Sequence, residues 1–114
     1  MKNLSVFFVM YVLVQSAWAA DCTADVENES ARLSGNRFYT SWHVRHNAGN
    51  NRSATVFFEY RIHYRNKRGA ELVESGVFKR YMRGQGGQFT KENLSTNNPV
   101  EILSVDFHGV DCHD

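Results

Sequence analysis

The sequence predicts an all-β domain, specifically an immunoglobulin- or fibronectin III-like β-sandwich of six to seven strands with one disulfide. Three observations support this fold class. Apolar and polar residues alternate over several segments, turn residues recur at intervals of about 8 to 12 residues, and two cysteines stand near the ends of the mature chain. No segment shows convincing helical periodicity.

Residues 1–19 have the three parts of a secretion signal. Lys2 supplies a positive start, residues 6–14 are an unbroken apolar run, and Ala17-Trp18-Ala19 places small residues where a signal peptidase acts. A membrane anchor is the alternative, but it needs about 20 apolar residues to cross a bilayer. We therefore expect cleavage, leaving residues 20–114 as one secreted or periplasmic domain without a stable membrane anchor.

Charge and cysteine usage narrow the class of protein. Lys2 is the only charged residue of the signal, so the mature chain carries 12 Lys and Arg (13 less Lys2) against 12 Asp and Glu. This balance argues against nucleic acid as a partner. In an oxidising compartment Cys22 and Cys112 are expected to form a disulfide. The alternative is a metal site of Cys112 with His108 and His113, which lacks the close cysteine pairing of zinc sites.

The strands are predicted from the apolar alternation and from the turns between them. They are Thr23 to Val26, Arg37 to His46, Thr55 to Arg65, Ala70 to about Met82 with a bend or bulge near Gly76, Phe89 to Leu94, and Val100 to Cys112. The expected connections are the loop 47–51, the hairpin turn 66–69, the turn 84–87 and the break at 97–99. Trp42 is the candidate core tryptophan, and Leu103, Val105 and Phe107 are the expected core face of the last strand.

The sequence does not predict a set of side chains that could act together in catalysis. His43 and His63 lie on the outward faces of their predicted strands and would be neighbours if those strands pair, but outward histidines on a sheet are usually solvated. There is no Gly-x-Ser-x-Gly turn, and the turn 84–87 lacks the Lys-Ser/Thr of a phosphate loop. The sequence therefore predicts no enzyme, no cofactor and no metal.

Three Asn-x-Ser triplets begin at Asn28, Asn51 and Asn93. They would be glycan acceptors in a eukaryotic secretory protein. The short signal with a single lysine is more typical of bacteria, which favours polar loop positions without modification.

The outward faces of two strands offer aromatic and arginine side chains, which protein-binding surfaces favour. The candidate binding residues are Tyr39, His43, Arg45, Phe57, Arg61, His63 and Arg65. The alternative is that Phe57 is covered and that the arginines pair with Glu59 and Glu71. An exposed strand edge could also accept a second copy, giving a homodimer through strand exchange with the turn 84–87 as hinge.

From Thr55 onward the order is an aromatic-rich strand, a basic turn with glycine, a strand, a Gly-rich turn, and Asn-Pro before a last strand. This order resembles small immunoglobulin-like domains exported by Gram-negative bacteria. The size, the signal and the terminal cysteine pair resemble the bacterial interleukin receptor mimic proteins, secreted fibronectin-type domains that bind host cytokines. The resemblance implies host interleukins as partners, but the Trp-Ser-x-Trp-Ser signature of cytokine receptors is absent, so no binding residue is carried over.

The leading hypothesis is a secreted, non-enzymatic protein-binding module that binds host cytokines and modulates immunity, a virulence function. The alternative is a periplasmic accessory or chaperone protein for the assembly of surface fibres or adhesins. A third hypothesis, an enzyme or metal protein, would be dismissed if metal analysis of the pure protein found no metal and replacement of His43 and His63 caused no loss of function.

Overall fold

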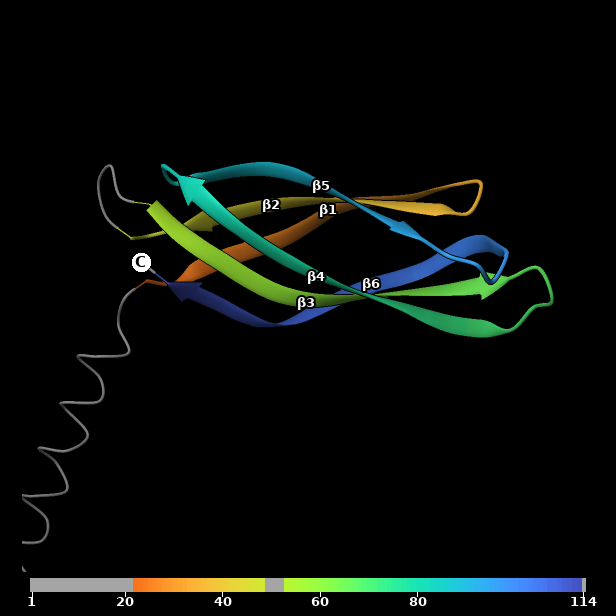
Figure 1. The fold of residues 1–114 in the computed structure, drawn as a ribbon. Coiled ribbons are helices and arrows are strands. Elements are labelled where there is room, and N and C mark those ends of the chain that lie inside the picture. Colours follow the sequence, from red (N-terminus) through yellow and green to blue (C-terminus); the bar gives the residue numbers. More distant parts are fainter. Residues whose placement is uncertain (1–21, 49–52, 114) are drawn as a thin grey trace, which may run out of the picture.

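A computed structural model describes residues 22–48 and 53–113, and the predicted signal and Asn51 lie outside these residues. The described chain forms six strands: β1 (Ala24–Ser34), β2 (Arg37–His46), β3 (Ser53–Asn66), β4 (Glu71–Arg83), β5 (Gly86–Leu94) and β6 (Pro99–His113). They make two antiparallel sheets of three strands each, ordered β1-β2-β5 and β4-β3-β6. Figure 1 shows the two sheets as two layers along the length of the domain. The predicted all-β sandwich is confirmed, with six strands.

The core is built by the two central strands, β2 and β3. Every second residue of each faces the other sheet, and these positions are buried while their neighbours are not. Trp42 is fully buried, as predicted, with its ring centroid 4.9 Å from that of Phe58 and 5.6 Å from that of Phe107. Its indole nitrogen donates a hydrogen bond to Thr40 Oγ1 at 2.8 Å, so the one polar atom of the ring is satisfied.

The first strand is longer than predicted. Thr23 to Val26 was expected to form a short strand, but β1 continues to Ser34 and pairs with β2 over its whole length. Its middle is polar and the register shifts between Asn28 and Ser30, so the apolar alternation is interrupted there. Hydrogen bonding to β2 continues the strand through the segment in which apolar and polar residues do not alternate.

Strand β4 has no bulge at Gly76, contrary to the prediction. The ladder between β3 and β4 runs without a register shift from the Ser53–Arg83 pair to the Arg65–Glu71 pair. Gly76 is needed for another reason, because the buried ring of Tyr60 lies over it. A Cβ at this position would stand 2.3 Å from Cζ of that ring.

The last strand also differs from its prediction. Val105 and Phe107 pack against the core as expected, but Leu103 is 36% exposed and Ile102 packs inward instead. The cause is a register shift, which places Ile102 opposite Tyr64 and leaves Leu103 without a partner on β3. Pro99, which was expected to lie between strands, is the first residue of β6.

The predicted disulfide is confirmed. It joins Cys22, two residues before β1, to Cys112 in β6, with a Cα–Cα distance of 5.4 Å across 90 residues of chain. Such a bond is typical of an oxidising, extracytoplasmic compartment. Because Cys112 is bonded, it is not available to the alternative metal site with His108 and His113. Within residues 22–48 and 53–113, no helix is long and apolar enough to cross a membrane.

Candidate functional site

The predicted binding residues do not form one surface. Tyr39, His43 and Arg45 lie on β2, whereas the other four lie on β3, and these strands belong to different sheets. The outward residues of the two strands therefore lie on opposite outer faces of the sandwich. His43 and His63 are accordingly not neighbours.

The outer face of the β4-β3-β6 sheet, here called the β3 face, is built from the outward residues of three strands. On β3 these residues are Thr55, Phe57, Glu59, Arg61, His63 and Arg65. Opposite them β4 places Tyr81, Lys79, Val77, Ser75, Val73 and Glu71, and β6 places His113, Asp111, His108, Asp106, Ser104 and Glu101.

Arg61, His63 and Arg65 are fixed by carboxylates of β6. Arg61 Nε donates to Asp106 Oδ1 at 3.0 Å, and His63 Nε2 lies 2.6 Å from Asp106 Oδ2. Arg65 donates to Glu101 Oε2 at 2.9 Å. Hydrogen bonds from His63 and then Arg61 lower the pKa of Asp106 below its usual value.

These pairs differ from the alternative considered from sequence, in which Glu59 and Glu71 neutralised the arginines. Glu59 instead lies 3.1 Å from His108 Nε2. All of these side chains are substantially exposed, and exposed ion pairs contribute little to stability. Their effect is to hold the charged groups at fixed positions on the β3 face.

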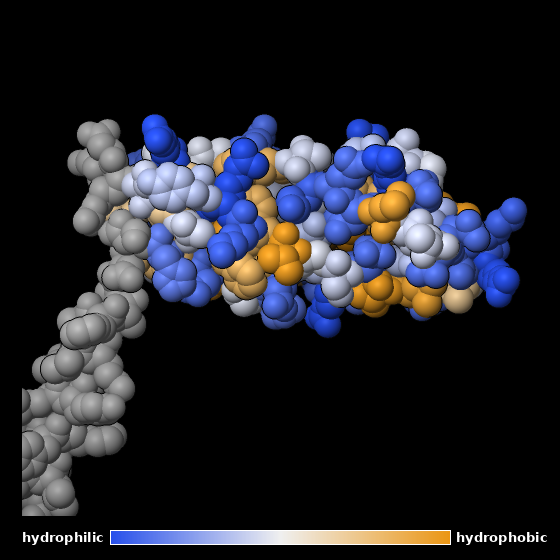
Figure 2. Space-filling model, in the orientation of Figure 1, coloured by the Kyte–Doolittle hydropathy of each residue, from blue (hydrophilic) through white to orange (hydrophobic). Residues whose placement is uncertain are grey.

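Three large apolar side chains on β4 are exposed on this face: Val73 and Val77, each 49% exposed, and Tyr81, 63% exposed. They are spaced four residues apart, so they point to the same side of the strand. Phe57 on β3 is half-buried and pairs with Lys79, between Val77 and Tyr81. Figure 2 shows hydrophobic side chains reaching the molecular surface in separate groups among hydrophilic ones.

A hollow of about 290 Å³ lies at the middle of the β3 face. It lies over the backbone of Gly76, between the outward side chains of the three strands, and its rim includes Glu59, Arg61, Val77 and His108. The volume is just below the range of about 300–1,000 Å³ for small-molecule sites.

The opposite outer face, over β1-β2-β5, has fewer exposed large hydrophobic residues. The guanidinium of Arg32 lies 4.3 Å from the ring centroid of Tyr39, which is only half-exposed. Arg37 and Glu92 form an ion pair across β2 and β5. Leu94, 57% exposed, is the one exposed large hydrophobic residue of this sheet within the described chain.

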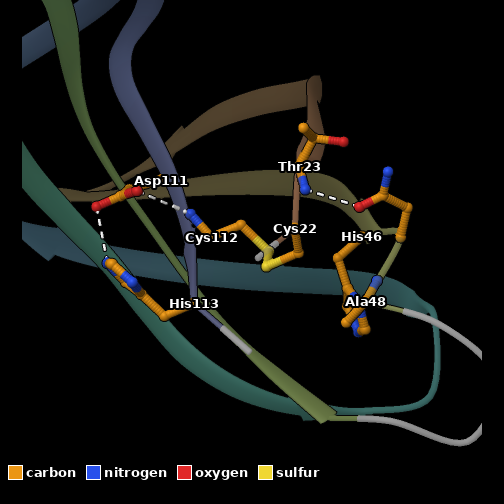
Figure 3. The surroundings of a disulfide bond; sticks show 8 residues. Cys22, Thr23, His46, Ala48, Asp111, Cys112 and His113 are labelled. Atoms are coloured by element: carbon orange, nitrogen blue, oxygen red, sulfur yellow. Dashed lines mark hydrogen bonds and ion pairs between the residues drawn. A yellow bond between two sulfur atoms is a disulfide. The ribbon is translucent and has the colours of Figure 1, made fainter. Parts of the chain in front are cut away.

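His46, which was not among the predicted site residues, is buried in the structure, with 6% of its surface exposed. Its Nδ1 accepts a hydrogen bond from the Ala48 amide at 3.2 Å, and its Nε2 has no partner among residues 22–48 and 53–113. Figure 3 shows His46 near the disulfide, at the end of β2. The alternation of Trp42 and Val44 continues to position 46, so the strand period could have identified it.

Two of the three Asn-x-Ser asparagines form hydrogen bonds within the fold. Both lie in strands, whereas polar loop positions were predicted. Asn28 Nδ2 donates to the carbonyls of Ser30 and Ser41, at 3.2 and 3.1 Å. Asn93 Oδ1 accepts a hydrogen bond from the hydroxyl of Tyr60 at 2.7 Å. Both amides therefore serve the structure.

Comparison with known proteins identifies no family for this chain. No family model matches the sequence, and no curated protein sequence matches it. Among solved structures, a DUF1425 family member from Shewanella sp. pv-4 is similar over 77% of this chain and 76% of its own, at 15% identity and a TM-score of 0.41. A TM-score of this size supports neither a family assignment nor a function.

Proposed function

We propose that this chain is an exported, non-catalytic protein-binding domain whose β3 face is the binding surface. The observation that carries the proposal is the row of Val73, Val77 and Tyr81, three large apolar side chains exposed on one side of β4. Host cytokines are the partner class that the sequence resemblance implies.

The make-up of the β3 face supports protein binding. Protein interfaces combine an apolar centre containing aromatic residues with a polar rim, and tyrosine and arginine are common among the residues that dominate binding energy. Here Phe57, Val77 and Tyr81 supply the apolar part, while Arg61 and Arg65, held by carboxylates, supply charge toward the other end of the same face. The hollow over Gly76 would accept a protruding side chain of the partner.

The test is binding of residues 20–114 to a panel of purified interleukins on a biosensor. Tyr81→Ser is expected to weaken binding at least about tenfold, because Tyr81 is the largest and most exposed side chain of the row and tyrosine is a typical anchor. Leu94→Ser is the matched control, since Leu94 is 57% exposed on the opposite sheet. Absence of binding at about 1 µM would refute cytokines as partners. Equal losses for the two variants would refute the β3 face.

The second candidate is a periplasmic accessory or chaperone for surface fibres, which would add a strand of its client to an open sheet edge. The outer edge of β4 is the place for such a strand, because this 13-residue strand has no register shift against β3; the client strand would need charges opposite to those of the inward Glu74 and Arg80. Finding the processed protein in the periplasm, with delayed fibre assembly after its deletion, would support this function. Normal assembly in the deletion strain would dismiss it.

A further inference from the structure

β4 is the most regular open edge of the sandwich. Only β3 pairs with it in the described chain, and that ladder has no register shift. The other edge strands carry features that discourage addition of a strand. β6 begins with Pro99 and has three register shifts, β1 has one, and β5 places Lys91 inward, opposite the buried Thr40.

β4 carries inward charges of its own, and they have a particular order. Glu74 and Arg80 pair with Ile62 and Val56, whose side chains are fully buried, so both charges lie on the inner side of the strand. A foreign strand added to this edge would meet two charges beside its own inward residues. Such charges normally prevent edge-to-edge association.

A second β4 strand would neutralise them. When β4 is aligned antiparallel to a copy of itself about Val77, opposite residues are complementary along its whole length. The pairs are Glu71 with Arg83, Leu72 with Met82, Val73 with Tyr81, Glu74 with Arg80, Ser75 with Lys79, Gly76 with Phe78, and Val77 with itself. Opposite charges and aromatic–aliphatic pairs at directly opposed positions stabilise antiparallel strands.

We propose that two copies of this chain pair along β4 about a two-fold axis at Val77, forming a continuous sheet ordered β6-β3-β4-β4-β3-β6. Each ion pair occurs twice, because the interface is symmetric. Both chains keep all of their own strands, so no exchange at the turn 84–87 is required. The inference is independent of the proposed function, although the dimer would join the apolar rows of both β3 faces into one stripe.

The test uses the ends of β4. Glu71 and Arg83 are exposed and twelve residues apart, which in a strand is about 40 Å, so they cannot contact each other within one chain. The dissociation constant of residues 20–114 is measured by sedimentation equilibrium for Glu71→Arg, Arg83→Glu and the double variant. Each single reversal places like charges opposite each other twice and is expected to weaken the dimer about tenfold. The double variant restores opposite charges and is expected to return to within about threefold of the wild type.

Glu27→Arg is the control, because Glu27 is exposed on β1, far from the proposed interface in the strand order. It should leave the dissociation constant unchanged, and circular dichroism should show that all variants fold. A wild-type chain that stays monomeric up to about 100 µM would overturn the proposal. A dimer that the double variant fails to restore would also overturn it. Neither result depends on interleukin binding.

Discussion

Replacement of Gly76 by alanine tests how the two sheets are held together. The fully buried ring of Tyr60 lies over Gly76, and an added Cβ would stand 2.3 Å from ring atom Cζ and 2.4 Å from the hydroxyl oxygen. That hydroxyl donates to Asn93 Oδ1 at 2.7 Å, linking β3 in one sheet to β5 in the other. The ring cannot stay in place, so both its packing and this hydrogen bond are disturbed.

The expected loss of unfolding free energy is about 2 kcal/mol. Overpacking costs about 1–3 kcal/mol, and weakening this partly buried hydrogen bond costs about 0.5–1.5 kcal/mol. Alanine restricts the unfolded chain more than glycine does, which offsets about 0.4–1 kcal/mol of this. Urea unfolding followed by Trp42 fluorescence measures the loss, since Trp42 is buried and is the only tryptophan in residues 20–114. Low protein concentration avoids any contribution from association.

Gly87→Ala is the matched control. A Cβ on Gly87 would have no atom within 4 Å, and its φ is not in the left-handed region, so its stability should change by less than about 1 kcal/mol. In a Tyr60→Leu background, Gly76→Ala should cost clearly less than in the wild type, because the ring is gone. If Gly76→Ala and Gly87→Ala have equal effects, the packing argument is refuted.

Two further perturbations have defined outcomes. Replacing Cys22 and Cys112 by serine should lower the free energy of unfolding by about 4–5 kcal/mol, because the bond closes a 90-residue loop; a loss below about 1 kcal/mol in urea unfolding would contradict this. The lowered pKa of Asp106 contributes stability that is present above the usual aspartate pKa of about 3.9 and is lost as the pH falls through the lower native value. Asp106→Asn should therefore reduce the loss of stability between neutral and strongly acidic pH, and an unchanged pH profile of urea midpoints would count against the Asp106 contacts.

The bounds of β2, β3, β4 and β6 were predicted within two residues, but the inward residues were predicted best for the central strands. β2 and β3 are central strands buried on one face, so burial imposes a strict period of two on their sequences, and both were found nearly to their ends. β1 and β6 are edge strands whose registers shift. Each shift changes which residues face inward, so alternation predicts the wrong core residue, as it did for Leu103.

The strand pattern could not predict that the candidate binding residues lie in two different sheets. Alternation gives the face of a strand to which a side chain belongs, but not the sheet to which the strand belongs. Tyr39 and His63 are both outward residues of adjacent strands in the sequence, yet the chain passes from one sheet to the other between β2 and β3. The ion-pair partners of Arg61 and Arg65, and the hollow over Gly76, depend on which strands pair and in which register. Alternation along one strand does not give that information.

The two proposals share β4 but make separable demands on it, and thermodynamics links them. If a partner binds across the joined β3 faces of a dimer, it binds the dimer more tightly than the monomer, so partner binding and dimerisation must favour each other by the same factor. Glu71→Arg would then weaken partner binding at low protein concentration, although Glu71 need not touch the partner. Tyr81→Ser would weaken partner binding at every concentration. If Glu71→Arg weakens dimerisation but leaves partner binding unchanged at all concentrations, each chain binds its partner alone and the dimer serves another purpose.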